Sequence, residues 1–162
     1  MAERVFIGIG SNLGDREGNL REAIRLAEAG EGLSVVRASS FYESEPWGVE
    51  EQPRFVNAVF EARTSLGPRG LLGYLKGIEA KMGRVPTVKW GPRLIDMDII
   101  LYGERVIKEG DFEVPHPRAH ERAFVMVPLS EIAPDAAHPV LGLTASEIAG
   151  GLDKAGLRRI GG

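Results

Sequence analysis

The sequence has no cysteine at any of its 162 positions. Disulfide bonds, thiolate catalysis and cysteine-based zinc sites are therefore excluded. It also lacks any stretch approaching the ~20 consecutive apolar residues that span a bilayer. The opening segment, MAERVFIGIGSN, leads directly into a short apolar run and lacks the long apolar region and cleavage site of a secretory signal. We therefore expect a cytoplasmic protein with no membrane partner.

Neither sign of charge is in large excess. Lys and Arg together number 20, Asp and Glu together number 23, and the net charge is -3. Proteins that bind nucleic acid over a wide surface usually carry a positive excess, so we expect no nucleic-acid partner. The length, with 43% hydrophobic residues, is enough to bury one ordinary core. We expect a single domain over residues 1–162, acting as a monomer.

An acidic pair interrupts an apolar strand pattern in the segment WGPRLIDMDIILYG, residues 90–103. Residues 94–102 alternate, which predicts one face carrying Ile95, Met97, Ile99 and Leu101 and another carrying Asp96 and Asp98. Same-face neighbours on a strand lie roughly 6–7 Å apart at their Cα atoms, which leaves room for one or two hard cations. Asp is depleted in strands. The pair therefore predicts a Mg²⁺ site, the alternative being the solvated face of an ordinary strand.

Cations precede this acidic pair. Residues 84–93 contain Arg84, Lys89 and Arg93 and no acidic residue. Cations that contact phosphate oxygens, beside acids that bind a metal, are what a nucleotide with bound Mg²⁺ requires. A solvated basic loop is the alternative interpretation.

Two segments predict contacts to a flat ligand. In the strand expected over residues 55–63, alternation places Phe55 and Asn57 opposite the core face, which carries Val56, Ala58, Phe60 and Ala62. A ring beside an amide can stack on a heterocycle and hydrogen-bond its edge. Trp47 lies in a polar loop, where it contacts such a ligand or folds back onto the core.

The order of expected elements predicts the fold. Strands over residues 5–9, 33–42, 55–63 and 94–102 alternate with two helices, over residues 16–29 and 68–82, and both helices carry an apolar stripe. This βαββαβ order indicates a ferredoxin-like α+β fold, an antiparallel sheet with the helices on one face. We expect the glycines of GIGSNLG to form a tight strand-to-helix turn. Beyond Gly103 we expect a short extra hairpin, a helical turn over residues 118–124 and one or two C-terminal helices between residues 145 and 157.

Four separated motifs resemble one family. They are G-S-N-L-G at 10–14, F-Y-x-S-x-P-x-G with Q-P-x-F-x-N at 41–57, G-R then W-G-P-R-x-x-D-x-D at 83–98, and V-P-H-P with R-A-F at 114–124. In this order and spacing they resemble the 6-hydroxymethyl-7,8-dihydropterin pyrophosphokinases of folate biosynthesis. The resemblance implies a ferredoxin-like fold and transfer of diphosphate from ATP to the pterin hydroxymethyl group, with release of AMP.

The resemblance also implies roles for individual residues. Asp96 and Asp98 would hold two Mg²⁺ ions, and Arg84, Arg93 and Asp98 would act in catalysis. The ATP co-substrate would be bound by a further set, Glu79, Trp90, Ile99, His116 and Arg122. The pterin would be bound by Ser44, Pro46, Trp47, Phe55, Asn57 and Phe124. Phe55 replaces a tyrosine that is common in the family, which removes a hydroxyl and keeps the ring.

Two other classes of function are alternatives. Ferredoxin-like sheets also serve as non-catalytic ligand- or RNA-binding modules, although the charge balance and the acidic pair favour an enzyme. An Asp-x-Asp pair is also found in other Mg-dependent nucleotidyl or glycosyl transferases. A test for AMP formed from ATP and the pterin separates the three.

Overall fold

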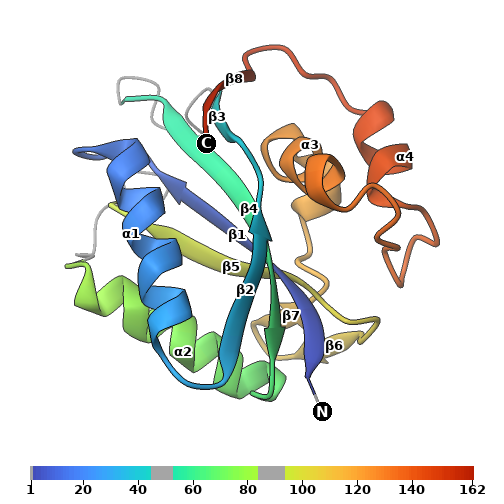
Figure 1. Cartoon of the computed structure of the whole chain (residues 1–162). Helices are drawn as coiled ribbons and strands as arrows, with labels where there is room; N and C mark the ends of the chain where they lie inside the picture. The colour runs from blue at the N-terminus through green and yellow to red at the C-terminus, as the bar shows by residue number, and fades with distance from the viewer. Residues whose placement is uncertain (1, 45–52, 84–93) are drawn as a thin grey trace.

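The computed structural model describes residues 2–44, 53–83 and 94–162 (Figure 1). Its centre is a six-stranded sheet in the order β5, β1, β4, β3, β8, with β2 also paired to β4. All of these pairs are antiparallel. The strands are β1 (Glu3–Ser11), β2 (Leu33–Ala38), β3 (Phe41–Ser44), β4 (Phe55–Thr64), β5 (Asp96–Tyr102) and β8 (Arg158–Gly161). Strands β6 (Ile107–Glu109) and β7 (Phe112–Val114) form the expected extra hairpin.

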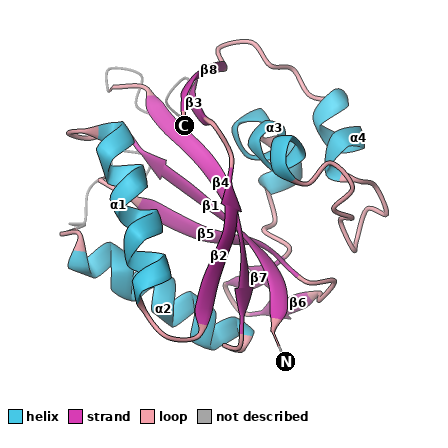
Figure 2. Ribbon diagram, in the orientation of Figure 1, coloured by secondary structure: helices cyan, strands magenta, loops and turns pink. Residues whose placement is uncertain are grey.

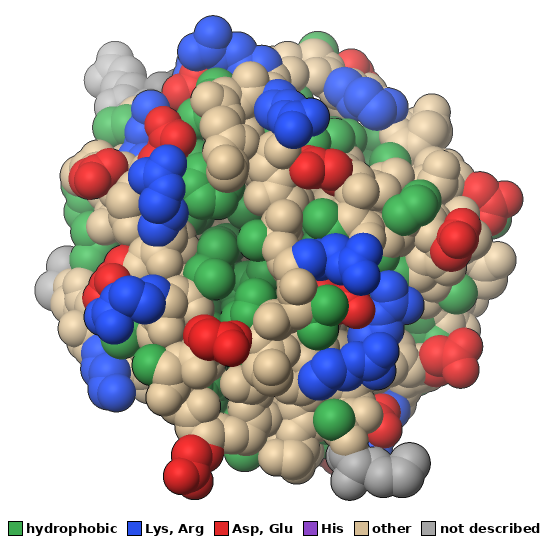
Figure 3. Space-filling view, viewed as in Figure 1, with side chains coloured by type: hydrophobic (Ala, Val, Ile, Leu, Met, Phe, Trp, Pro, Cys, Tyr) green, Lys and Arg blue, Asp and Glu red, His purple; other side chains and the backbone are tan. Residues whose placement is uncertain are grey.

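Helices cover both faces of the sheet (Figure 2). One face packs against α1 (Arg16–Ala29) and α2 (Pro68–Lys81), and the other against α3 (Ala123–Ile132) and α4 (Ala145–Gly150). A short 3-10 turn, η1 (Ala119–Glu121), precedes α3. None of the helices in the described residues is long and apolar enough to cross a membrane. Basic and acidic side chains are interspersed over the face shown in Figure 3, as the balanced composition predicts.

The two predicted helices form where the pattern placed them. The Asp15 side chain accepts a hydrogen bond from the Gly18 N–H and caps α1, which buries Leu20, Ala23 and Ala27. Pro68 opens α2, whose Leu71, Leu75 and Ile78 are buried in the same core. These two stripes and the facing side of β1, β4 and β5 make the larger of the two cores.

The prediction for the last residues of β5 was wrong. Leu101 was expected on the face of Ile99, but it packs with Phe6 in the core beneath α3 and α4. The reason is a bulge: Ile7 pairs with Ile99 and Phe6 pairs with Leu101, so Ile100 is an extra residue. A bulge reverses the alternation downstream of it, and local pattern alone does not reveal it.

The strand expected over residues 33–42 is divided into β2 and β3. At the break, the Ser39 hydroxyl accepts a hydrogen bond from the Val59 N–H and donates one to the Ser40 carbonyl. The Ser40 N–H and hydroxyl both donate to the Glu131 carboxylate on α3. The Ser39 N–H still donates to the Val59 carbonyl, but the Ser40 N–H bonds to α3 in place of a neighbouring strand, so the strand is interrupted there and α3 is tied to the sheet.

The C-terminal part also differs from the prediction. The apolar run after Phe124 is helix α3, whereas a shorter helical turn was expected to end there. Helix α4 forms within the expected tail region, with a capping box between Thr144 and Glu147. The residues after it form strand β8, which pairs with β3 and was not expected.

Candidate active site

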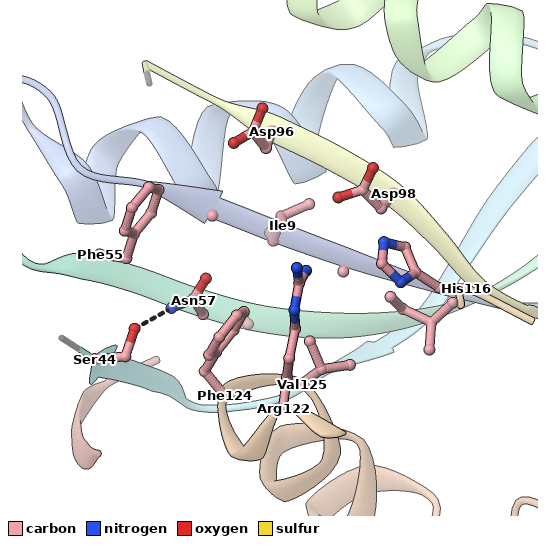
Figure 4. A pocket seen from close by; sticks show the side chains of 14 residues that line it. Ile9, Ser44, Phe55, Asn57, Asp96, Asp98, His116, Arg122, Phe124 and Val125 are labelled. Carbon is pink, nitrogen blue, oxygen red and sulfur yellow. Dashed lines mark hydrogen bonds between the residues drawn. The ribbon is translucent and has the colours of Figure 1, made fainter. Parts of the chain in front are cut away.

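A pocket of about 340 Å³ opens on the sheet face that α3 covers in part. Its walls come from β1, β3, β4, β5, the loop before η1 and the start of α3 (Figure 4). The polar and aromatic side chains that line it are Ser44, Phe55, Asn57, Asp96, Asp98, His116, Arg122 and Phe124. Segments that are 80 residues apart in the chain, such as Ser44 and Phe124, thus meet at one site.

One end of the pocket is aromatic. In Figure 4, Asn57 lies between the rings of Phe55, at the start of β4, and Phe124, in the first turn of α3. The Asn57 Nδ2 donates a hydrogen bond of 2.8 Å to the Ser44 Oγ. This bond fixes the orientation of the amide and leaves Oδ1 on the side of Gly10. The end of the pocket can therefore stack a flat ring and offer a fixed acceptor to its edge.

Glycines form the floor. Gly8 and Gly10 lie within β1 and line the pocket, and they are not in the turn that the sequence suggested. A Cβ on Gly10 would lie 2.6 Å from the Asn57 Oδ1, and one on Gly8 would lie 3.0 Å from the Ile100 Cδ1. Only Gly14, with φ of 71°, serves the turn through a positive φ. A larger residue at position 10 would occupy the space in front of the amide.

The register of the sheet sets the distance between the acidic end and the ring-binding end of the pocket. Gly10 pairs with Asp96 on one side and with Asn57 on the other. Neighbouring strands lie about 4.8 Å apart, so the Cα atoms of Asp96 and Asn57 are roughly 10 Å apart across the glycine. The carboxylate end and the ring-binding end are therefore adjacent, one on each side of β1.

The acidic pair lies in the predicted arrangement. Asp96 and Asp98 project from β5 on the same side as Phe55 and Asn57, because all four line one pocket. The Asp98 side chain is 48% exposed, and its Oδ1 lies 4.0 Å from the Lys76 Nζ. The pair is thus accessible to a solvated cation.

Two basic side chains face this acidic end. Burial lowers the pKa of His116, although the charge of Asp98 raises it in part. The His116 Nδ1 accepts a hydrogen bond from the Arg118 N–H, so the neutral ring carries its proton on Nε2. Burial also lowers the pKa of Arg122, against the opposing effect of Asp98. Both side chains line the pocket and can donate to an anionic ligand.

Several predicted residues lie elsewhere or are not described. Ile99 points into the core shared with α1 and α2, so any ligand contact that it makes involves its backbone. Glu79, on α2, is 3% exposed; it accepts a hydrogen bond from the Met97 N–H of β5 and does not line the pocket. The remaining predicted residues lie outside the described ranges: Pro46, Trp47, Arg84, Trp90 and Arg93.

The structure adds residues that the sequence analysis missed. Gly8, Gly10, Ile100 and Val125 line the pocket, although none was expected there. For the glycines there was a signal, since two glycines two positions apart in a strand pattern indicate close approach of another group. For Ile100 there was also a signal, because a period of two places it on the strand face of Asp96 and Asp98.

Comparison with known proteins identifies the family. Residues 6–134 match the model of the family described as 7,8-dihydro-6-hydroxymethylpterin-pyrophosphokinase (HPPK). The chain belongs to this family. A 2-amino-4-hydroxy-6-hydroxymethyldihydropteridine pyrophosphokinase of Methylorubrum extorquens is 41% identical over 157 residues, which are 97% of this chain and 98% of that protein. As a member of the HPPK family, the chain is a diphosphotransferase.

Other HPPK relatives are longer proteins. The folic acid synthesis protein fol1 of Pneumocystis carinii is 44% identical over 142 residues, which are 88% of this chain and 19% of that protein. A crystal structure of a Plasmodium falciparum HPPK-DHPS triple mutant with pteroate matches with a TM-score of 0.76 at 15% identity, covering 99% of this chain and 47% of that one. The chain thus spans about a fifth and about half of these two proteins. The structural match shows that the mixed α/β fold is shared.

Proposed function

We propose that the pocket between β4, β5 and α3 is the active site of this pyrophosphokinase of folate biosynthesis. The hydroxymethyl oxygen of 6-hydroxymethyl-7,8-dihydropterin attacks the β-phosphorus of ATP, the bond from that phosphorus to the α,β-bridging oxygen breaks, and AMP leaves. One observation carries the proposal: a single pocket joins a ring-binding end to an acidic end across the glycine floor of β1. A diphosphate acceptor with a flat ring needs both ends at once.

The aromatic end suits the pterin. Phe55 and Phe124 would stack on the two faces of the ring, and Asn57, held by Ser44, would hydrogen-bond its polar edge. The fixed acceptor Oδ1 favours a ring edge that carries N–H groups. Pro46 and Trp47 remain predicted contacts to the same substrate.

The acidic end fits Mg²⁺. Asp96 and Asp98 supply carboxylate oxygens at a partly exposed wall, and among the described residues no group of three or more His, Cys, Asp or Glu forms a closed metal cage. Mg²⁺ is usually bound by one or two carboxylates together with phosphate oxygens and water. We infer two ions here, which would neutralise the triphosphate and polarise the attacking hydroxyl.

The remaining side chains handle charge and the proton. His116 and Arg122, which line the pocket, would donate to the phosphate oxygens, joined by Arg84 and Arg93. Glu79, Trp90 and Ile99 remain predicted contacts to ATP. Asp98 would accept the hydroxyl proton, the alternative being that polarisation of the hydroxyl by the metal is sufficient. A flat pH–rate profile across the carboxylate range, in enzyme saturated with Mg²⁺, would contradict a carboxylate base.

The test is direct. The protein is incubated with ATP, Mg²⁺ and 6-hydroxymethyl-7,8-dihydropterin, and the nucleotide products are separated. We expect AMP in proportion to the pterin consumed. Formation of ADP, or AMP formation that does not depend on the pterin, would contradict the proposal.

We also infer the fold plan, the cellular setting and the oligomeric state. The order β5, β1, β4 and then the divided strand β2 and β3, with α1 and α2 on one face, supports a ferredoxin-like plan within one domain. We propose a cytoplasmic setting for this reaction. We propose that the chain acts as a monomer, which light scattering with size-exclusion chromatography would test.

A further inference from the structure

Strand β5, which carries the acidic pair, is the end strand of the sheet and lies beside α2 (Figure 1). Such a strand has backbone groups that no neighbouring strand pairs on its outer side. Two side chains of α2 contact these groups at Met97. The Met97 N–H donates a hydrogen bond of 2.7 Å to the Glu79 Oε2, and the Lys76 Nζ donates one of 3.2 Å to the Met97 carbonyl.

Those two backbone groups belong to the only two peptide units between the metal carboxylates. The Met97 N–H is part of the peptide that follows Asp96, and the Met97 carbonyl is part of the peptide that precedes Asp98. Each peptide is planar, so fixing both planes fixes the backbone direction from one aspartate to the other. The relative placement of the two carboxylates therefore depends on Glu79 and Lys76.

The Glu79 end of this contact is buried, whereas the Lys76 side chain is 47% exposed. Glu79 is 3% exposed, the Met97 side chain is fully buried, and Lys76 also donates to the Glu79 Oε2 at 3.1 Å. Glu79 thus holds both Lys76 and the Met97 N–H through a single oxygen. A buried carboxylate that accepts two hydrogen bonds keeps its position, because moving it would leave donors and acceptors unpaired in the protein interior.

We propose that Glu79 and Lys76 are positioning residues that hold Asp96 and Asp98 in the geometry for metal binding by clamping the backbone of Met97. The inference rests on the proposed metal site. It assigns Glu79 a role through the strand, since its side chain does not line the pocket. Residues that orient metal ligands from behind typically change metal affinity by about 10–100-fold when they are removed.

The first test compares Glu79→Ala with Glu79→Gln, with Glu22→Ala as the matched control. Glu22 forms the same kind of i,i+3 helical ion pair, with Arg25 on α1, but it is partly exposed and is not part of the pocket. Hydrogen exchange of the Met97 amide is measured by NMR. We expect about 10-fold faster exchange or more in Glu79→Ala. Glu79→Gln, which keeps an acceptor oxygen, and Glu22→Ala should both stay close to the original protein.

The second measurement separates positioning from direct nucleotide contact. The affinity for Mn²⁺ in the presence of a non-hydrolysable ATP analogue is measured from the paramagnetic resonance signal of the ion. Binding of the analogue without metal is measured separately, in EDTA. For Glu79→Ala we expect Mn²⁺-dependent binding to weaken by about 10-fold or more beyond any loss measured in EDTA, because the clamp acts only through the metal carboxylates. An equal loss in EDTA, or an unchanged Met97 exchange rate, would overturn the inference.

For Lys76, the direction of the change in cation affinity distinguishes a positioning role from a simple charge effect. Its Nζ lies 4.0 Å from the Asp98 Oδ1, so if it acted only as a charge, Lys76→Met would tighten cation binding. If it positions the strand, the same change weakens Mn²⁺ binding, and we expect a loss of several-fold. Tighter binding would overturn the positioning role. Circular dichroism shows whether each variant is folded. If Glu79→Ala is unfolded, Lys76→Met carries the test.

These readouts are independent of turnover. Absence of AMP with the original protein would contradict the proposed function, and the exchange and metal-binding measurements would still report on the clamp. Conversely, normal metal binding in an active Glu79→Ala variant would overturn the clamp alone.

Discussion

Replacing Gly10 by alanine tests how the floor of the pocket controls the ring-binding end. The backbone at Gly10 is not in the positive-φ region, so alanine fits the strand conformation. Its Cβ, however, would lie 2.6 Å from the Asn57 Oδ1, which is too close for either atom to remain in place. Because Asn57 is 7% exposed and bonded to Ser44, the amide can move only by breaking that 2.8 Å hydrogen bond.

The size of the effect follows from the bonds that are lost. A hydrogen bond contributes about 1 kcal/mol net, and the displaced amide would lose both its bond to Ser44 and its bond to the substrate edge. Together these amount to about 2 kcal/mol, which corresponds to a roughly 30-fold weaker binding of the pterin. The carboxylates of Asp96 and Asp98 stay in place, so kcat should fall much less than kcat/KM.

The assay measures pterin-dependent AMP formation together with pterin binding by fluorescence. Gly73→Ala is the matched control, because a Cβ at that position of α2 meets nothing within 4 Å. It should leave pterin binding unchanged and stabilise the protein by about 0.5–1 kcal/mol, since alanine is a better helix former. Pterin affinity of the Gly10→Ala variant within twofold of the original protein would refute the reasoning about the Asn57 amide.

Three further predictions follow from the same structure. Asp96→Asn should lower turnover by at least about 100-fold without lowering the melting temperature, since it removes a proposed metal ligand and eases repulsion with Asp98; normal turnover would exclude the metal assignment. Burial, together with Glu131, raises the pKa of Tyr42 to about 12, so Glu131→Gln should shift the absorbance titration of Tyr42 toward 10 and cost about 1–2 kcal/mol of stability. Burial and the neighbouring His120 lower the pKa of His138, so the imidazole of the folded protein binds a proton less readily than that of the unfolded chain. The urea concentration at the midpoint of unfolding should therefore be constant above about pH 6.5 and fall as the pH drops below that value.

Much of the site was predictable from sequence because short-range alternation decides which side chains share a face. Asp96 with Asp98 and Phe55 with Asn57 follow from the period of two along a strand. The meeting of the two pairs depends on strand order, which the succession of elements indicated. Phe124, on α3, could be assigned only by resemblance, since no periodicity shows which face of the sheet a later helix covers.

What escaped prediction depends on contacts between distant segments. The division of β2 from β3 requires Ser39 to bond Val59 and Ser40 to bond Glu131, 91 residues away. A sequence in which residues 33–42 alternate gives no indication that a carboxylate from α3 will compete for those backbone groups. The bulge at Ile100 also depends on a distant segment, because it is defined by the pairing of β5 with β1.

The pair Lys76 and Glu79 shows where spacing stops being informative. Among the residues that the structure describes, two helical ion pairs share the i,i+3 spacing, Lys76 with Glu79 and Glu22 with Arg25. Spacing predicts a modest surface ion pair in each case, and for Glu22 that description is sufficient. At Glu79 the same spacing places a buried oxygen against the peptide between the metal carboxylates. The difference is made by the strand that each helix packs against, and so the functional role of such a pair can be found only after the elements are assembled.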